Sequence, residues 1–403
     1  MKIRVLSLIL AIVLTLGMVG VLSSCGETNY AENNTKIKIG ASGPLTGGAA
    51  IYGIAVRNSA MLAVAEINAI EAAGGEGTLG LQFEFEMYDD KHDPTNVPTG
   101  YANLFENGMQ VSLGTVTTKP GLEFKVLAKD DNVFFLTPSA TGDAVPEFSN
   151  GYQMCFADSN QGGASARYFN ENYQGKKVGV FYKSDDEYSK GIYDQFVATL
   201  DKSFGTPVAA PFTGDANTFD SQIQLLKDCD VIFMPIYYTP ASQFMTQGKS
   251  TVKANAIYYG CDGLDGIDAI DGFDIKSIPQ EVSYLSHFNS NATSGPAKVF
   301  IDKYNAAYDT AKEPLNQFGA AAYDCVWAIY EAMKVAKANG KEIPANIAPS
   351  DLCNILTEVF NGDFTFHGIT GKTEGDNKST ISWESSGYVN KEAIKYVVKE
   401  ANA

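Results

Sequence analysis

The chain has 403 residues, of which 45% are hydrophobic and 19% are charged, and its formal net charge at pH 7 is −17. This composition is typical of a globular protein that can fill large cores. The acidic balance argues against nucleic acid and anionic lipid as partners, but it does not exclude a small ligand, because a local pocket can oppose the overall charge.

The first residues form a targeting segment that does not belong to the fold. Lys2 and Arg4 precede an apolar run over residues 5–21. The next letters, "LSSC", have the form of a lipobox that ends at Cys25. We expect residues 1–25 to be a lipoprotein signal peptide, with Cys25 carrying the lipid. An ordinary cleaved signal and a retained N-terminal membrane helix stay open as alternatives.

Residues 26–35, "GETNYAENNT", are polar and predict a flexible tether. The processed protein is therefore expected outside the cytoplasm, anchored by lipid to the bacterial cell membrane. Loss of the cations Lys2 and Arg4 takes its net charge from −17 to −19. Its length of about 370 residues favours two domains over a single core.

Five cysteines follow Cys25, and none of them forms a C-x-x-C pair. A zinc or redox motif is therefore not indicated, and no cofactor is expected. Because the number is odd, at least one thiol is unpaired within the chain. We expect mostly buried free thiols at Cys155, Cys229, Cys261, Cys325 and Cys353.

The first series of predicted elements alternates strand and helix. In "KIKIG" two isoleucines share one face of a short strand, and "LQFEFEMYDD" alternates apolar and polar residues as a half-exposed strand does. Strands are predicted at 36–40, at 81–90, near 111 and at 133–136. Helices are predicted at 53–73, 95–107 and 119–130, the first ending at two glycines.

A second series begins near residue 160 and follows the same plan. Strands are predicted in "KVGVFY", "TPVAAPF", "DVIFMPIYY" and "NAIYYG", with helices at 162–173, 187–204, 218–227 and 242–249. Later helices are predicted at 296–308, 317–338 and 350–360, and later strands at 380–383 and 387–389. Two repeated series of strand and helix predict two α/β lobes, each a doubly wound and mainly parallel sheet.

Two strands of the first series end in small hydroxyl residues. "TVTTKP" places Thr117 and Thr118 after one strand, and "TPSATG" places Ser139 and Thr141 after the next. Open α/β sheets bind ligands beyond the carboxyl ends of their strands, where helix N-termini favour anions. These residues are candidate donors to a ligand carboxylate. The alternative is that they are ordinary caps and turn residues.

The second series carries tyrosines and an acid at its strand ends: Tyr188, Tyr237, Tyr238 and Asp262. Tyrosines can wall an apolar side chain, and a carboxylate can hold an ammonium group by a charge-assisted bond. The two groups together would suit an amino-acid zwitterion. A turn between two glycines is the alternative explanation for Asp262.

Catalytic motifs are absent from the sequence. The three histidines, His92, His287 and His367, lie far apart, and neither H-E-x-x-H nor G-x-S-x-G occurs. A G-x-G-x-x-G at residues 75–80 follows a helix and precedes a strand, so it is interpreted as a loop. We predict that the protein is not an enzyme and holds no metal; a hydrolase site assembled in space stays as an alternative.

Several ordered motifs carry a family resemblance over about residues 36–400. They are "IGASGPLTG", "AEINA", "DDKHDP", "TPSAT", "DSNQGGASARY", "YSKG" and "GCDG". The chain resembles the type I periplasmic substrate-binding proteins of the branched-chain amino-acid ABC transporter class, and is similar to leucine/isoleucine/valine-binding proteins. The resemblance implies two lobes joined by a three-strand hinge, with crossovers near residues 157, 286 and 366. Lobe I then comprises 36–157 and 287–366, and lobe II comprises 158–286 and 367–403.

The resemblance also implies roles for single residues. The loop and the "SAT" triplet that hold the ligand's carboxylate and amine correspond to Thr117, Thr118, Ser139, Ala140 and Thr141. Asp262 matches the acidic residue that binds the ammonium. Aromatic ligand contacts correspond to Tyr52, Tyr188, Tyr238 and Phe318.

The resemblance has departures as well. His92 stands where some relatives have a disulfide cysteine, so that bridge is not expected. A polar segment near residue 290 shifts the alignment.

The implied function is capture of a small amino acid between the lobes by hinge closure, with delivery to ABC permease subunits. A monomer is expected, with no nucleic acid partner and with a lipid anchor as its only membrane contact. A sensor of the same fold, and a receptor for another small carboxylate or amide, are the alternatives.

Overall fold

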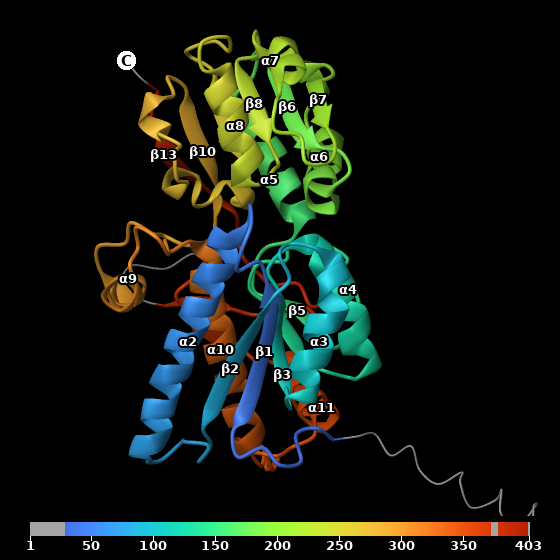
Figure 1. The fold of residues 1–403 in the computed structure, drawn as a ribbon, viewed down its shortest axis with the longest axis vertical. Coiled ribbons are helices and arrows are strands. Elements are labelled where there is room, and N and C mark those ends of the chain that lie inside the picture. The colour runs from blue at the N-terminus through green and yellow to red at the C-terminus, as the bar shows by residue number, and fades with distance from the viewer. Residues whose placement is uncertain (1–28, 372–377, 402–403) are drawn as a thin grey trace, which may run out of the picture.

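The computed structural model describes residues 29–371 and 378–401 as two α/β lobes stacked along the long axis (Figure 1). The predicted signal peptide and Cys25 lie outside the described residues. Each lobe has its own sheet with helices on both faces, which is the layered arrangement that repeated strand and helix units produce.

The sheet of the first lobe has the order β2-β1-β3-β4-β5, with all strands parallel. Its strands are β1 (Ile37–Gly43), β2 (Phe83–Asp89), β3 (Val111–Thr115), β4 (Phe135–Thr137) and β5 (Gly151–Gln153). Its helices are α2 (Ala50–Ala73), η1 (Pro94–Asn96), α3 (Val97–Glu106), α4 (Thr118–Asp130), α9 (Gly295–Ala307), α10 (Gln317–Ala338) and α11 (Pro349–Phe360).

The second sheet has the order β13-β10-β9-β8-β6-β7, parallel except for β13 against β10. Its strands are β6 (Val178–Lys183), β7 (Val208–Phe212), β8 (Val231–Met234), β9 (Ile257–Gly260), β10 (Glu281–Ser286) and β13 (Ile394–Lys399). Its α-helices are α5 (Asp158–Asn172), α6 (Glu187–Thr199), α7 (Asp220–Leu226) and α8 (Tyr238–Gly248); short 3₁₀ turns are η2 (Lys202–Phe204), η3 (Asp262–Leu264), η4 (Ile267–Ala269) and η5 (Ile275–Ser277).

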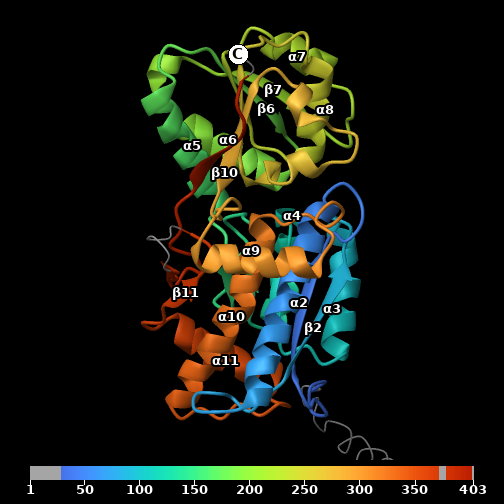
Figure 2. The same ribbon diagram turned by 90° about the vertical axis from the view of Figure 1, so that its left-hand side faces the viewer.

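The first five strands of each lobe follow the same order, with the second, first, third, fourth and fifth strands side by side. This is a doubly wound sheet whose switch point lies between its first and third strands. The predicted fold class, two mainly parallel α/β lobes, is confirmed. Figures 1 and 2 show that the lobes meet through the loops at one end of each sheet.

Within the described residues, the chain passes between the lobes three times. The first passage lies between β5 and α5, the second follows β10, and the third precedes β13. Lys391 of the third passage is buried and donates from Nζ to the carbonyl of Met154 in the first passage, at 2.7 Å. The passages therefore run side by side, as Figure 2 also shows.

The third passage lies later than the sequence analysis placed it. It was expected near residue 366, but residues 379–389 still contact the first lobe. The two-stranded sheet of β11 (Phe366–Gly368) and β12 (Ser379–Ile381) is followed by Trp383, whose indole N–H donates to the carbonyl of Gln153 at 2.7 Å. Its ring lies 4.6 Å from that of Phe360. This long-range packing leaves no periodic signal in the sequence.

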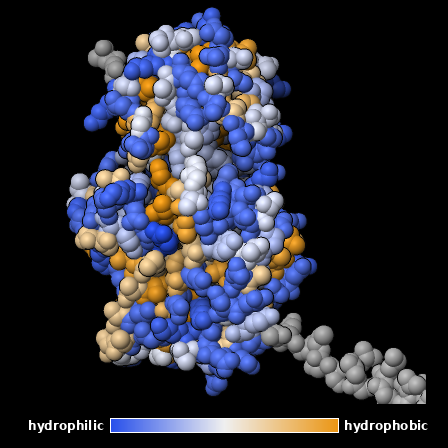
Figure 3. All heavy atoms as spheres, viewed as in Figure 1, coloured by the Kyte–Doolittle hydropathy of each residue, from blue (hydrophilic) through white to orange (hydrophobic). Residues whose placement is uncertain are grey.

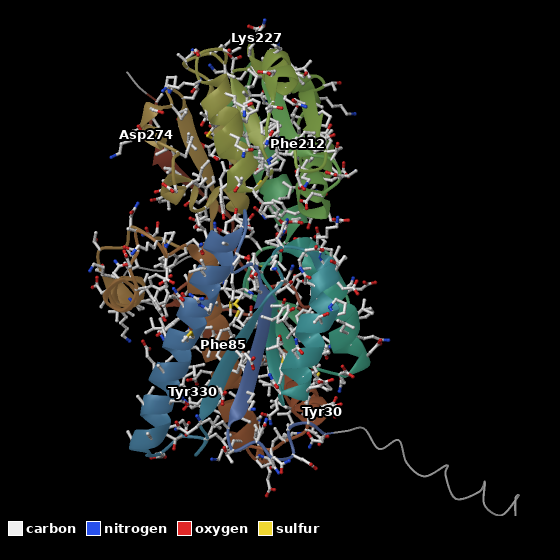
Figure 4. All side chains as sticks on the ribbon, in the orientation of Figure 1. Tyr30, Phe85, Phe212, Lys227, Asp274 and Tyr330 are labelled. Atoms are coloured by element: carbon white, nitrogen blue, oxygen red, sulfur yellow. The ribbon has the colours of Figure 1, made fainter. Side chains whose placement is uncertain are left out.

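The expected tether is shorter than residues 26–35, because residues 29–35 pack on the base of the first lobe. Tyr30 contacts the ring of Phe105 at 5.6 Å, and Ala31 is fully buried. The amide of Asn34 donates to the carbonyl of Gly108 at 2.8 Å. Figure 4 shows Tyr30 at the end of the molecule opposite Lys227.

Smaller differences concern single elements. The strand expected over "DVIFMPIYY" ends at Met234, because Pro235 cannot continue a ladder of hydrogen bonds, and α8 begins at Tyr238. The strand expected at 387–389 is only a bridge between Trp383 and Val389. The G-x-G-x-x-G segment is a loop, as predicted, between α2 and β2. The five described cysteines are free and buried, as expected.

Helix α2 is the one helix of the described residues long and apolar enough to cross a membrane, and 56% of its most apolar window is buried. It packs along α10 in the first lobe, so it is a core helix of the fold.

Candidate ligand-binding site

The threonines after β3 lie at the start of α4. Thr117 is the residue before the helix and has extended backbone angles, while Thr118 opens its first turn. The hydroxyl of Thr118 accepts a hydrogen bond from the backbone N–H of Gly142 at 3.1 Å. This bond joins the loop after β3 to the loop after β4, because the two strands are neighbours in the sheet. The two hydroxyl segments therefore form one surface, as the sequence suggested.

The segment after β4 presents Ser139 and Thr141 to the same space. Both side chains are buried and line a cavity together with Thr117 and Thr118. The carbonyl of Thr141 accepts from the backbone N–H of Asp158 at 2.8 Å, which ties this segment to the first passage between the lobes. Ala140 differs from its neighbours: its side chain packs in the core of the first lobe with Val145.

Asp262 and Tyr188 come from the second lobe. Asp262 begins the turn η3 after β9, and Tyr188 lies in the first turn of α6. The tyrosine hydroxyl donates to Oδ1 of Asp262 at 2.6 Å and accepts from the N–H of Gly263 at 2.9 Å. Gln161 accepts from the backbone N–H of Asp262 at 3.0 Å. Asp262 is thus held by one bond to its carboxyl group and one to its backbone.

Asp262 is almost fully buried, with 2% of its surface exposed. Burial raises the pKa of its carboxyl group to about 7, against the opposing effect of the hydrogen bond from Tyr188. No lysine or arginine forms an ion pair with Asp262 within the described part of the chain. A buried carboxylate without a counter-ion is stabilised by a cation that enters its site.

Aromatic side chains enclose the space between these groups. Tyr52 of α2 and Phe318 of α10 lie edge to face at 4.9 Å, both from the first lobe. Tyr237, from the loop after β8, stacks on Tyr188 at 4.7 Å and 16°. Together with Val116, these rings form the apolar part of the cavity lining.

Tyr238 has a different place from the one its predicted role suggests. It does not line the cavity but packs edge to face on Tyr52 at 4.8 Å. Its hydroxyl accepts from the backbone N–H of Ile51 in the first lobe at 3.3 Å. Tyr238 therefore joins the lobes beside the site.

Other bonds also cross between the lobes next to the cavity. The hydroxyl of Tyr52 donates to the carbonyl of Gly263 at 2.5 Å, and that of Thr239 donates to the carbonyl of Gly48 at 2.7 Å. The N–H of Gln317 donates to Asp265 at 2.8 Å. On the face in Figure 3 the spheres of the two lobes run together. The structure is thus a closed form.

In this closed form the cavity is narrow, with a volume of about 10 Å³. It is lined by Tyr52, Val116, Thr117, Thr118, Ser139, Thr141, Tyr188, Tyr237, Asp262, Gly263 and Phe318. Eight of the ten residues expected at the site are in this set, and Ala140 and Tyr238 are not. A wider groove lies elsewhere on the first lobe, between α10 and α11, and contains none of these residues.

Tyr237, Val116 and Gly263 are the lining residues that the implied roles left out. Tyr237 carried a usable signal, since it stands with Tyr188 and Asp262 among the residues expected at the strand ends of the second series. Val116 and Gly263 carried none, because an apolar residue and a turn glycine are common anywhere. Within residues 29–371 and 378–401, no three His, Cys, Asp or Glu side chains are grouped as a metal site.

A family model described as periplasmic binding protein matches residues 36–347. The chain belongs to this family. Its fold and two-lobed site agree with a type I member similar to Leu/Ile/Val-binding proteins. It is accordingly an extracytoplasmic solute-binding protein of the ABC transporter class, and the family is not enzymatic.

Two bacterial relatives illustrate the similarity. The Leu/Ile/Val-binding protein BraC3 of Rhizobium johnstonii is 28% identical over 376 residues, covering 88% of this chain and 93% of its own. The leucine-, isoleucine-, valine-, threonine- and alanine-binding protein of Pseudomonas aeruginosa is 24% identical, covering 89% and 91%.

Solved structures show the same fold with different ligands. A leucine-binding protein from Thermotoga maritima has a TM-score of 0.74 at 22% identity, over 90% of this chain and 95% of its own. The LivJ protein of Streptococcus pneumoniae in complex with isoleucine has a TM-score of 0.69 at 26% identity, over 90% and 100%. A solute-binding protein of R. palustris in complex with benzoate has a TM-score of 0.72 at 17% identity, over 90% and 93%.

Proposed function

We propose that this protein captures a small amino acid, with an aliphatic or aromatic side chain, between its two lobes and delivers it to an ABC permease. The observation that carries the proposal is the pairing of Asp262 with a set of hydroxyl donors in one cavity. An amino acid has one ammonium and one carboxylate on the same carbon atom. The site offers one partner of the right kind to each.

The carboxylate would lie against Thr117, Thr118, Ser139 and Thr141. Two of these residues begin α4, a helix of 13 residues whose N-terminal N–H groups add partial positive charge. Neutral donors can hold an anion here without a cationic side chain. The ammonium would lie against Asp262, whose carboxyl has Tyr188 as its hydroxyl donor.

The side chain of the ligand would contact Tyr52, Val116, Tyr237 and Phe318. Apolar walls favour an apolar side chain, because burial removes that surface from water. The names of the curated relatives agree with this class.

Closure of the hinge would couple ligand binding to the relative position of the two lobes. Donors on one lobe and the acid on the other can reach the same ligand only when the lobes are closed, so the ligand favours the closed form. The bonds that join Tyr52 to Gly263 and Thr239 to Gly48 would form in the same movement. The permease would then recognise the closed, loaded receptor.

We further propose that Cys25 carries a lipid that holds the protein at the cell membrane. The shortened tether would keep the base of the first lobe near the lipid, because residues 29–35 pack on that base. If a signalling partner recognised the closed form in place of a permease, the ligand site would be the same. Uptake of labelled ligand in cells with and without the permease separates the two roles.

The direct test is a thermal-shift screen of the twenty amino acids on the processed protein, followed by calorimetry on those that bind. A ligand that binds the folded state raises the melting temperature. We expect one or a few apolar amino acids to do so. If only sugars or nucleosides raise it, the proposed ligand class is wrong.

A matched pair of ligands tests the two ends of the site. An amino acid and the same molecule without its amine share the carboxylate and side chain. We expect the deaminated acid to bind at least about 100-fold more weakly, because Asp262 would be buried without a cation. Equal affinities, or tight binding of benzoate, would assign the protein to receptors for simple carboxylates.

A further inference from the structure

The turn after β2 holds two consecutive residues in the left-handed region. Lys91 has φ of 57° and His92 has φ of 63°, and neither is a glycine. Side chains of L-residues disfavour this region. Such conformations persist only where neighbouring groups hold them, and they occur often at functional sites. The role of His92 was left open by the ligand roles described above.

Two aspartates hold this turn to the end of β1. Asp89 accepts from the N–H groups of Lys91 and Leu45, at 3.1 and 2.8 Å. The buried Asp90 accepts from the N–H of His92 at 2.9 Å and from the hydroxyl of Ser42 at 2.9 Å. The backbone of His92 is therefore fixed by groups that belong to the sheet.

The held side chain points into the junction between the lobes. Nδ1 of His92 lies 2.9 Å from Oγ1 of Thr117, at the start of α4. Its ring meets Tyr237 of the second lobe edge to face, at 5.1 Å and 80°. Tyr237 stacks in turn on Tyr188, which donates to Asp262. One imidazole thus contacts a residue on each side of the site.

We propose that His92 is a positioning residue that commits the Thr117 hydroxyl to donate to the ligand carboxylate and joins the lobes through Tyr237 on closure. This inference rests on the proposed function, because it takes Thr117 to bind a carboxylate.

The chemistry follows from the tautomer of the ring. If Nδ1 carries the proton, the imidazole donates to Thr117, whose own proton is then free for the ligand. If Nε2 carries it, Nδ1 accepts the Thr117 proton, and only lone pairs of the hydroxyl face the cavity. The first tautomer suits a carboxylate, and the second suits an ammonium.

The ring is neutral over the physiological range, so its tautomer matters. Burial, together with the charges of Lys183 and Lys119, lowers the pKa of His92 to about 4. Asp215 and Asp93 act in the opposite direction and do not outweigh these effects. The surrounding charges come from the turn itself, α4 and the second lobe.

Nitrogen-15 NMR of the histidine rings tests the bond directly. The chain has only His92, His287 and His367, so the spectrum is simple, and the last two serve as internal references. We expect the His92 signals to show a protonated Nδ1. Thr117→Val should change the His92 signals and leave those of His287 and His367 unchanged. A protonated Nε2 with bare Nδ1, or a spectrum unchanged by Thr117→Val, would overturn the proposal.

Binding measurements test the role. His92→Phe keeps an aromatic ring beside Tyr237 but removes the bond to Thr117, and we expect affinity for the amino acid to fall about 3- to 10-fold. In a Thr117→Val background the same change should have little further effect, because the two residues act as one unit. His367→Phe, on the exposed position of β11, is the matched control.

The two hypotheses fail in different ways. If the wild-type protein binds no amino acid, the proposed function is wrong, while the NMR spectrum still decides whether His92 donates to Thr117. If the wild type binds and His92→Phe binds equally well, or the losses of the two variants simply add, the role of His92 is wrong and the function stands.

Discussion

The two lobes share one strand order but contribute opposite chemistry to the site. The first lobe offers Thr117, Thr118, Ser139 and Thr141, neutral hydroxyls at strand ends and at a helix N-terminus. The second offers the buried acid Asp262 with its tyrosine partner. A duplicated scaffold can therefore carry two different half-sites, because the residues after each strand are independent of the sheet.

The difference has an energetic consequence. In the proposed complex, losing one neutral donor would remove a single hydrogen bond, and the remaining donors would still hold the carboxylate. Removing Asp262, the one acid that lines the cavity among the described residues, would leave the ammonium buried without a counter-charge. Variants of the second lobe should therefore weaken binding far more than variants of the first.

The largest effect is expected for Asp262→Asn, which keeps the shape of the side chain and removes its charge. Affinity for the amino acid, measured by calorimetry, should fall about 100-fold or more, because a buried ion pair loses one partner. Asp268→Asn, an exposed acid in the same loop, is the control and should bind normally. A loss below about tenfold would remove Asp262 from the ammonium role.

The next largest effect is expected for Tyr188→Phe, which deletes the hydroxyl that donates to Asp262 at 2.6 Å. Hydrogen bonds to charged groups contribute about 1.5–3 kcal/mol, so affinity should fall about 10- to 100-fold. The change should also raise the pKa of Asp262, since that bond stabilises the carboxylate. Calorimetry at two pH values measures both, and an unchanged pH dependence would contradict the second effect.

The pH dependence of binding should come from the second lobe. Only the ionised form of Asp262 attracts an ammonium group, and burial in the closed site raises the pKa of this carboxyl group to about 7. Affinity should therefore rise with pH as the carboxyl group ionises and then level off. Asp262→Asn should flatten this profile. A profile that falls as pH rises from 5 to 7 would contradict this assignment.

The smallest effect is expected for Ser139→Ala in the first lobe. This hydroxyl is one neutral donor among four, so its loss should weaken binding only about 2- to 10-fold. Val145→Ala, in the core of the same lobe, is a control for loss of packing without loss of a donor. If Ser139→Ala costs as much as Asp262→Asn, the contrast between the lobes is wrong.

Local patterns in the sequence were enough to predict much of the fold. Helix α10 begins at Gln317 and ends at Ala338, as its pattern predicted. The two hydroxyl segments were placed after adjacent strands, because in a parallel sheet consecutive strand ends fall at the same edge. The odd number of cysteines required at least one unpaired thiol, and the expected buried free thiols are what the described residues contain.

Other features depend on contacts between distant segments. Tyr237 and Tyr238 are neighbours in the chain, yet one lines the cavity and the other joins the lobes. Which tyrosine does which depends on where β8 stops and α8 starts. In the same way, the packing of Trp383 on Phe360 placed residues 379–389 with the first lobe.

The sequence by itself determined the fold class, the strand ends that carry chemistry and the kinds of groups they present, because these depend on local periodicity and residue type. Only the tertiary structure decided which of those groups share a cavity, how His92 reaches Thr117, and where the chain last crosses between the lobes. Such features arise from packing between residues up to hundreds of positions apart. Each of them depends on the geometry of the closed lobes, which no local pattern encodes.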